Sequence, residues 1–339
     1  MSEGTVAARA AWRQSVAGEA AARWQPPDRR RLLQLALAAV WLLDAVLQYQ
    51  SYMFTQMFGW MLAGTAGGNP AVIADPITWN AHIVEHHSVV TNAVFAAIQL
   101  ALALGIAWRP TVQAALAASI AWSLGVWWFG EGLGGVLSGT ADPVSGAPGA
   151  VIIYALLAVL LWPVSDGKPQ ASFVAGRPLG VWPARAAWLV LWGSLAWIAV
   201  QAANRTAQGL HDMISAMAAG EPGWLAALDR GTAGLLAHRG LPASIALAVV
   251  LAVIAAGICL PVPGARCAIA FAVIVSLAIW VAGQNFGGVL TGSATDPNSG
   301  LLLALLAAAY WPARTPAPAP AAAAPAPAEP GGGQRPPGS

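Results

Sequence analysis

Long apolar segments that contain almost no charge are the feature that most constrains the fold of this chain. A helix needs about 20 mostly apolar residues to cross the hydrocarbon core of a membrane. Eight segments are candidates, at 32–50, 89–107, 111–129, 147–162, 185–203, 242–261, 267–284 and 299–313. The first contains Asp44, and the fourth and eighth are short, so we expect six to eight spans.

The composition supports a polytopic integral membrane protein. Only 9% of the 339 residues are charged and 58% are hydrophobic, whereas about a quarter of the residues in a soluble domain are charged. A net charge of +2 and two cysteines argue against nucleic-acid binding, a secreted disulfide scaffold and a cytosolic enzyme. The expected fold is all-α, with about eight transmembrane helices in the lipid bilayer.

The positions of the basic residues predict the orientation, because Lys and Arg near span ends concentrate on the cytoplasmic side. With eight alternating spans, 13 of the 16 Lys and Arg residues lie on the side of the N-terminal segment. We therefore expect a multi-pass protein of the bacterial cell (plasma) membrane with both termini cytoplasmic. Residues 1–31 form the Arg-rich cytoplasmic start, and the Pro/Ala-rich tail at 314–339 is expected to be disordered.

A repeated sequence divides the chain. Residues 127–146 read WWFGEGLGGVLSGTADPVSG and residues 280–300 read WVAGQNFGGVLTGSATDPNSG, with an offset of 153 that becomes 154 at the Asp-Pro pair. The expected architecture is two tandem four-helix repeats, 32–163 and 185–313, joined by a cytoplasmic linker at 164–184. An even number of spans per repeat gives parallel repeats, whose interface could hold a site.

Ionisable residues near membrane depth and the repeated glycines are the candidates for ligand binding, because a charge in a membrane is costly. The set is Asp44, Glu131, Gly134, Gly135, Asp142, Gln284, Gly287, Gly288 and Asp296. Close helix packing by the glycines and simple Asp-Pro turns are the alternative interpretation. Glu131 and its counterpart Gln284 differ in charge, so acid chemistry at this level would belong to the first half.

A histidine cluster before the second span suggests a metal site. His82 and His86 share a face of a helix, a spacing that suits imidazole ligands, and the string matches the inverted zinc-protease pattern H-x-x-E-H. Methionines in the two long outer loops, which we expect at 51–88 and 204–241, could bind Cu(I). The metal candidates are His82, Glu85, His86, His87, Met57, Met61, His211, Met213 and Met217. A polar helix start, proton transfer by histidine and plain methionine packing are the alternatives.

Three strings carry a family resemblance. LLDAVLQYQSYMF, WWFGEGLGGVLSG and GAPGAVIIYALLAVLLWP resemble a group of functionally uncharacterised polytopic membrane proteins of high-GC bacteria, over most of residues 31–163. A four-span unit that opens with an Arg-Leu-rich helix is similar to the DoxX/DoxD-like four-helix membrane proteins. That second resemblance implies an association with quinone-linked redox complexes.

Two functional hypotheses follow from these residues. The first is a non-enzymatic transporter or membrane-complex subunit, with an outward-facing pocket for a cation or small ligand near Asp44, Glu131 and the histidine cluster. The second is a membrane redox component that binds haem, copper or quinone. The first is favoured because the histidines are not duplicated. Other membrane-complex subunits or a second copy of the chain are the expected partners, and no nucleotide-binding loop is present.

Overall fold

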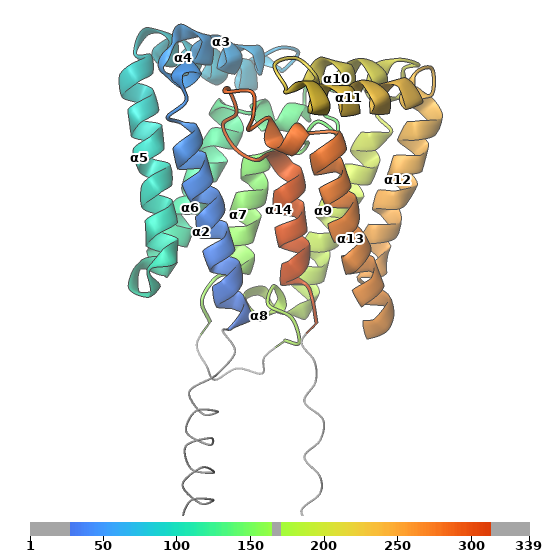
Figure 1. Ribbon diagram of the computed structural model, residues 1–339. Coiled ribbons are helices and arrows are strands. Elements are labelled where there is room, and N and C mark those ends of the chain that lie inside the picture. The colour runs from blue at the N-terminus through green and yellow to red at the C-terminus, as the bar shows by residue number, and fades with distance from the viewer. Residues whose placement is uncertain (1–27, 165–170, 313–339) are drawn as a thin grey trace, which may run out of the picture.

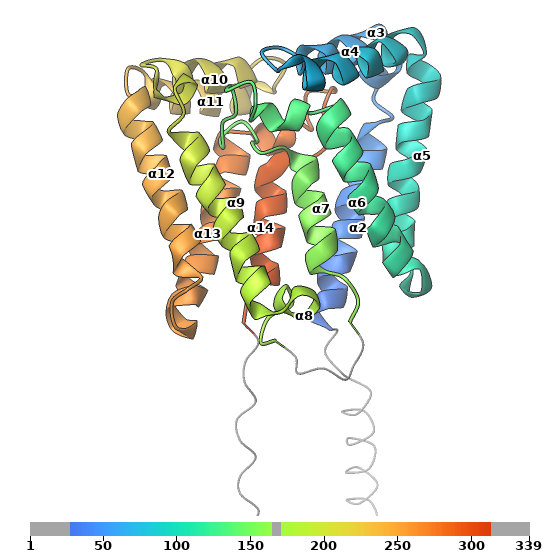
Figure 2. The same cartoon turned by 180° about the vertical axis from the view of Figure 1, so that it is seen from behind.

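The computed structural model describes residues 28–164 and 171–312, and these residues form helices and loops without a strand. Figures 1 and 2 show a bundle of upright helices, across one end of which four helices lie flat. We call these four helices, α3, α4, α10 and α11, the cover. Most of the Arg-rich start, residues 165–170 of the linker and the tail at 314–339 lie outside the described residues.

The order of elements is similar in the two parts of the chain. The first part contains α2 (Arg29–Leu47), η1 (Ser51–Phe54), α3 (Gln56–Gly64), α4 (Ala71–His86), α5 (Ser88–Ala107), η2 (Arg109–Thr111), α6 (Val112–Phe129), η3 (Gly132–Gly135) and α7 (Ala150–Leu160). The second part contains α8 (Gly176–Leu179), α9 (Val181–Ala199), η4 (Ala203–Arg205), α10 (Gly209–Met217), α11 (Gly223–Leu236), α12 (Gly240–Gly257), α13 (Val262–Ala282), η5 (Asn285–Gly287) and α14 (Asn298–Ala309).

Each of the eight apolar segments corresponds to an upright helix. Four of the helical stretches are long and apolar enough to cross a membrane, namely Ser88–Ala107, Arg109–Phe129, Gly240–Gly257 and Val262–Ala282, which identifies the chain as a membrane protein. The helices α2 and α9 have 19 residues each, whereas α7 and α14 have 11 and 12. At a rise of 1.5 Å per residue, α7 is about 17 Å long, roughly half of a hydrocarbon core.

The cover replaces the long outer loops that the sequence suggested at 51–88 and 204–241. Its helices are amphipathic, so they bury one face on the bundle end instead of crossing the membrane. In α3 and α4 the buried side chains include Phe58, Leu62 and Ile77, and in α10 they are Leu210 and Ile214. Apolar length alone finds spanning helices and misses helices of this kind.

The short helices α7 and α14 lie at the centre of the bundle (Figure 1). Tyr154 of α7 is fully buried against Trp41 of α2, with their ring centroids 4.3 Å apart. Tyr310, which follows α14, packs against Trp188 of α9, with their ring centroids 4.8 Å apart. The two helices also contact each other, so the cores of the two parts join into one cluster of buried side chains.

Arginine stabilises the end of the bundle opposite the cover. The Arg31 guanidinium donates to the carbonyl of Ile106 at 2.9 Å and to the carbonyl of Ala107, at the end of α5. The last carbonyls of a helix lack partners within it, and a cation there also complements the helix dipole. Gln34 donates to the Leu161 carbonyl at 2.9 Å, which joins α2 to the end of α7.

Reciprocal hydrogen bonds join the two parts near the cover. Gln50, which follows α2, donates to the carbonyl of Ala294 at 3.0 Å, and Asn204, which follows α9, donates to the carbonyl of Ala141 at 3.0 Å. Asn298 also donates to the carbonyl of Ser145 at 3.2 Å. The two glycine-rich loops, 130–149 between α6 and α7 and 283–297 between α13 and α14, are therefore each hydrogen-bonded to the other part of the chain.

Two glycines allow the loops to pass close to the starts of α7 and α14. Gly134 has a φ of +63°, and an added Cβ would lie 2.1 Å from the Pro148 carbonyl oxygen. Gly287 has a φ of +80°, and its Cβ would lie 2.3 Å from the carbonyl carbon of Pro297. A side chain at either position would be strained by its φ and would clash with the backbone.

We expect Gly134→Ala and Gly287→Ala to lower the thermal unfolding midpoint of the detergent-purified protein. Gly139→Ala is the matched control, because Gly139 has a φ of +75° but a Cβ there meets nothing within 4 Å. The backbone contact should cost about 1–3 kcal/mol beyond the control. Equal midpoints for Gly134→Ala and Gly139→Ala would contradict the close approach.

Candidate functional site

A cavity of about 640 Å³ lies beneath α3 and α4 of the cover. Its walls come from α2, α3, α4, α5, α6 and the start of α7, and from the loop before α14. Six aromatic side chains line it, namely Trp41, Phe58, Trp79, Phe95, Trp122 and Phe129. Pockets of this size, mostly apolar with a few polar groups, are typical of small-molecule sites.

Three carboxyl groups from distant parts of the sequence line this cavity. Asp44 lies in the last turn of α2, Glu131 lies two residues after α6, and Asp296 lies two residues before α14. The charge of Asp296 acts electrostatically on both other carboxyls. The structure therefore brings together three residues that the sequence identified separately, one of them from the second half of the chain.

Several oxygen acceptors in the cavity wall are buried and lack a hydrogen-bond donor. Asp44, only 2% exposed, accepts from the Tyr154 hydroxyl at 2.6 Å through Oδ2, while its Oδ1 has no donor. The Oε1 atoms of Gln48 and Gln99, which are 2% and 8% exposed, are also without a donor. Because buried polar atoms are normally hydrogen-bonded, these acceptors indicate a site for a donor or a cation.

Glu131 belongs both to the cavity and to the helix start beside it. Its Oε1 accepts from the backbone N–H of Val151 at 3.3 Å, and its buried Oε2 has no donor. Burial, and next the charge of Asp296, raise the pKa of Glu131 to about 8. None of the described residues in the cavity wall is Lys, Arg or His, so no basic side chain neutralises these acids.

Asp296 is held by its own turn. Its Oδ1 accepts from the backbone N–H of Asn298 at 2.7 Å, and its Oδ2 accepts from the Thr295 hydroxyl at 2.8 Å. Burial raises the pKa of Asp296. These two hydrogen bonds fix the side chain at the edge of the cavity, so the second half of the chain supplies a rigid carboxyl group to it.

The other predicted ligand-binding residues shape the loops or lie elsewhere. Gly134 lines the cavity, whereas Gly135, Gly287 and Gly288 are outside its wall, each with a φ between +67° and +80°. Asp142 accepts from the N–H groups of Val144 at 2.5 Å and Ser145 at 3.3 Å, as an Asp in a turn does. Burial raises the pKa of Asp142, but its side chain is not part of the cavity wall.

Gln284 has the same local role as Glu131 without the charge. Its Oε1 accepts from the backbone N–H of Gly300 at 2.9 Å, and its Nε2 donates to the Ser299 hydroxyl at 3.0 Å. It therefore caps the start of α14 as Glu131 caps the start of α7. Since a neutral amide is sufficient for the cap, the carboxylate of Glu131 is not needed for that structural role.

The histidine cluster lies on α4, outside the cavity wall. Ligand atoms of His82, Glu85 and His86 lie within 4.8 Å of one another, and the two imidazole centroids are 4.1 Å apart. Glu85 also accepts from the Trp60 indole of α3 at 3.0 Å. His87 directly follows α4 and is not in the group. Of the two methionines, Met57 is exposed and Met61 lines the cavity.

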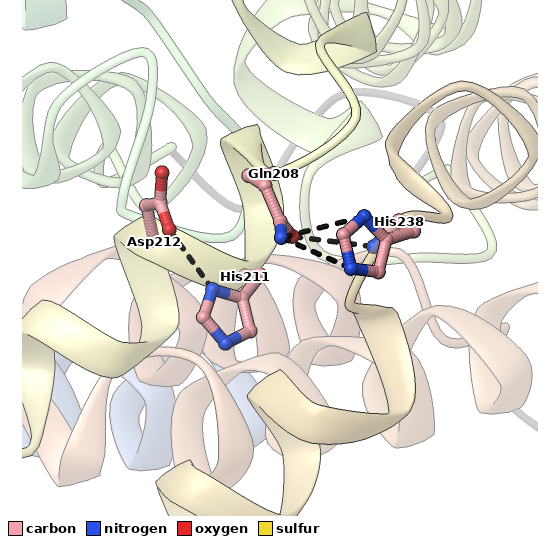
Figure 3. Close-up of polar contacts among 4 residues, drawn as sticks. All are labelled: Gln208, His211, Asp212 and His238. Carbon is pink, nitrogen blue, oxygen red and sulfur yellow. Dashed lines mark hydrogen bonds and ion pairs between the residues drawn. The ribbon is translucent and has the colours of Figure 1, made fainter.

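The second histidine and methionine set is separate from the first. His211 of α10 pairs with its neighbour Asp212 at 2.9 Å, and His238 contacts Gln208 (Figure 3). Met213 and Met217 lie on the same helix, where the Met217 carbonyl accepts from Asn285. Across 28–164 and 171–312, His211 joins no group of three His, Cys, Asp or Glu ligands.

Sequence reasoning missed the neutral polar part of the site. Gln48, Gln99 and Tyr154 were not among the candidates, although Gln99 and Tyr154 are uncharged polar residues inside strongly apolar helices. That contrast was an available signal, because a polar side chain within a membrane helix tends to face the protein interior. No family model, curated protein or solved structure matches this chain, so its function is argued from these residues alone.

We expect the thermal stability to fall as the pH rises from about 5 to 8. The pKa of Glu131 is about 8 in the folded protein and near its ordinary value of 4.5 when unfolded, so unfolding releases a proton and is favoured by alkali in this range. Glu131→Gln should flatten this slope in midpoints measured by intrinsic fluorescence. Asp212→Asn, at an exposed carboxyl of α10, is the control, and an unchanged slope in Glu131→Gln would contradict the assignment.

Proposed function

We propose that this protein is a transporter or membrane-complex subunit of the bacterial plasma membrane, with an outward-facing pocket that binds a cation. The observation that carries the proposal is the cavity wall, where the acids Asp44, Glu131 and Asp296 meet donor-free acceptors and no basic residue. Desolvated acids without a basic partner are costly. A bound cation would offset that cost and give the cluster a role.

The proposed topology has eight spans and cytoplasmic termini. The four long apolar helices form two consecutive pairs, α5–α6 and α12–α13, and each pair is flanked by upright helices of 11 to 19 residues. Arg31, Arg109 and Arg266 lie at helix ends opposite the cover (Figures 1 and 2), which supports a cytoplasmic location for that end. The cover and the cavity beneath it would then face outward.

Equivalent contacts support a tandem duplication. Trp127 donates to the Pro148 carbonyl at 2.7 Å, and Trp280 donates to the Pro297 carbonyl at 2.7 Å. The reciprocal amide bonds of Gln50 and Asn204 form a second matched pair. Two parallel repeats in contact provide two bodies whose relative motion could open and close a site between them, which favours transport.

Cation binding should stabilise the purified protein. At a ligand concentration of 100 Kd the gain is about 2.7 kcal/mol. We would compare thermal midpoints in the chlorides of Na⁺, K⁺, Ca²⁺ and 2-phenylethylammonium at equal ionic strength. At least one should raise the wild-type midpoint, and Asp44→Asn and Glu131→Gln should abolish that rise.

Asp212→Asn is the matched control for this experiment, because it removes an exposed acid outside the cavity. It should keep the wild-type response. A protein that responds to none of these cations, or an equal response in Asp44→Asn and Glu131→Gln, would contradict the proposed pocket.

A membrane redox component is the second candidate, and the compact group on α4 favours it. Two imidazoles and a carboxylate within 4.8 Å are ligands that suit Zn²⁺ or Cu²⁺. His82 and His86 would bind the metal, and Glu85 would complete the set.

This candidate predicts one equivalent of bound Cu²⁺ in metal analysis and an absorption band in the visible range. The double variant His82→Ala/His86→Ala should lose both, whereas His211→Ala should keep them. A colourless protein that fails to retain added Cu²⁺ would contradict it.

A further inference from the structure

We infer that the ligand of the cavity is an organic ammonium ion with an apolar or aromatic body. This inference rests on the proposed cation pocket and names the class of cation. Four observations carry it: the spacing of the acids, the aromatic wall, the volume and the donor-free acceptors.

The acids are too far apart to surround one small metal ion together. Ligands of one Ca²⁺ ion bind at 2.3–2.6 Å, so their oxygens lie within about 5 Å of one another. Among the described residues, the three-residue groups with all ligand atoms within 4.8 Å are confined to His82, Glu85 and His86. Asp44, Glu131 and Asp296 therefore line the cavity without converging on a point, as acids around a larger cation would.

The aromatic wall provides the surface that an organic cation prefers. Phe95 contacts Phe58 with centroids 6.4 Å apart and contacts Trp122 at 5.6 Å, both edge to face. The three rings come from α3, α5 and α6 and form one continuous part of the wall. A cation within about 6 Å of an aromatic face is attracted by the ring quadrupole, most strongly when it is desolvated.

The volume and the acceptors define the ligand further. A cavity of about 640 Å³ suits a drug-sized molecule and would be mostly unfilled around a single metal ion. The buried Asp44 Oδ1, Gln48 Oε1 and Gln99 Oε1 have no donor, so N–H or O–H groups of a ligand would satisfy them. A protonated amine supplies those donors and the positive charge, while its apolar body fills the remaining space.

We would test this with 2-phenylethylammonium, its neutral analogue 2-phenylethanol, benzyltrimethylammonium and Na⁺, by calorimetric titration of the full-length protein in detergent. We expect 2-phenylethylammonium to bind at least tenfold more tightly than the alcohol. The quaternary ion, which has no N–H, should bind more weakly than the amine. Glu131→Gln should weaken amine binding about tenfold or more, and its fold should be retained because Gln284 makes the same cap.

Trp122→Leu tests the aromatic wall, with an expected loss of about 3- to 30-fold in amine affinity. Trp224→Leu is the matched control, since Trp224 is 61% exposed on α11 and outside the cavity wall. Phe95→Leu provides a second wall variant if Trp122→Leu does not fold, and it should also weaken amine binding.

The outcomes separate this inference from the proposed pocket. If Na⁺, K⁺ or Ca²⁺ binds at Asp44 and Glu131 while the ammonium ions do not, the pocket stands and the organic-cation assignment is wrong. If the alcohol binds as tightly as the amine, the organic-cation assignment is wrong, and if no cation binds, both are wrong. Unchanged amine affinity in both wall variants would also overturn the aromatic part of the assignment.

Discussion

Two indole–carbonyl hydrogen bonds hold the irregular loops that the rest of the structure depends on. Trp127 at the end of α6 and Trp280 near the end of α13 each donate to a proline carbonyl at 2.7 Å, just before α7 and α14 begin. The central helices α7 and α14 are short, so the chain enters each of them through non-helical backbone. Buried backbone groups need hydrogen-bond partners, and these bonds, with the caps by Glu131 and Gln284, supply partners to both loops.

The two halves use the same scaffold for different chemistry. At the starts of α7 and α14 a glutamate and a glutamine accept from equivalent backbone N–H groups, but only the glutamate is ionisable. The cavity also contains Asp44 of α2 and the aromatic side chains of α5 and α6. Most of the cavity wall therefore comes from the first half, and the second half supplies Asp296 to it.

The upright helices and the acids of the cavity wall both stand out in the sequence, the helices by their apolar length and the acids against an apolar background. Apolar length located the eight upright helices, and Asp44, Glu131 and Asp296 were conspicuous as rare ionisable residues. The sequence did not distinguish Asp296 from Asp142, since both precede proline and both accept from the N–H two residues later, and only packing places Asp296 in the cavity wall.

The remaining features depend on three-dimensional contacts. Gln48 and Gln99 become informative only when the acceptor atoms of both are seen to be buried without donors. The cover helices were missed because they bury one face on the bundle end and are shorter than a membrane span. For the same reason, hydropathy could not show that the segments at 51–88 and 204–241 form the cover, or that a cavity lies beneath part of it.

Asp296 gives the cavity an unusual dependence on the whole chain. Its carboxylate enters the first-half cavity from the loop before α14, where its own turn holds it in place. Both halves therefore contribute to the site: the first half encloses most of it, and the second half supplies one of its three acids. Because both halves belong to one chain, the acid from the second half is always present at the cavity, at an effective concentration that does not depend on the amount of protein.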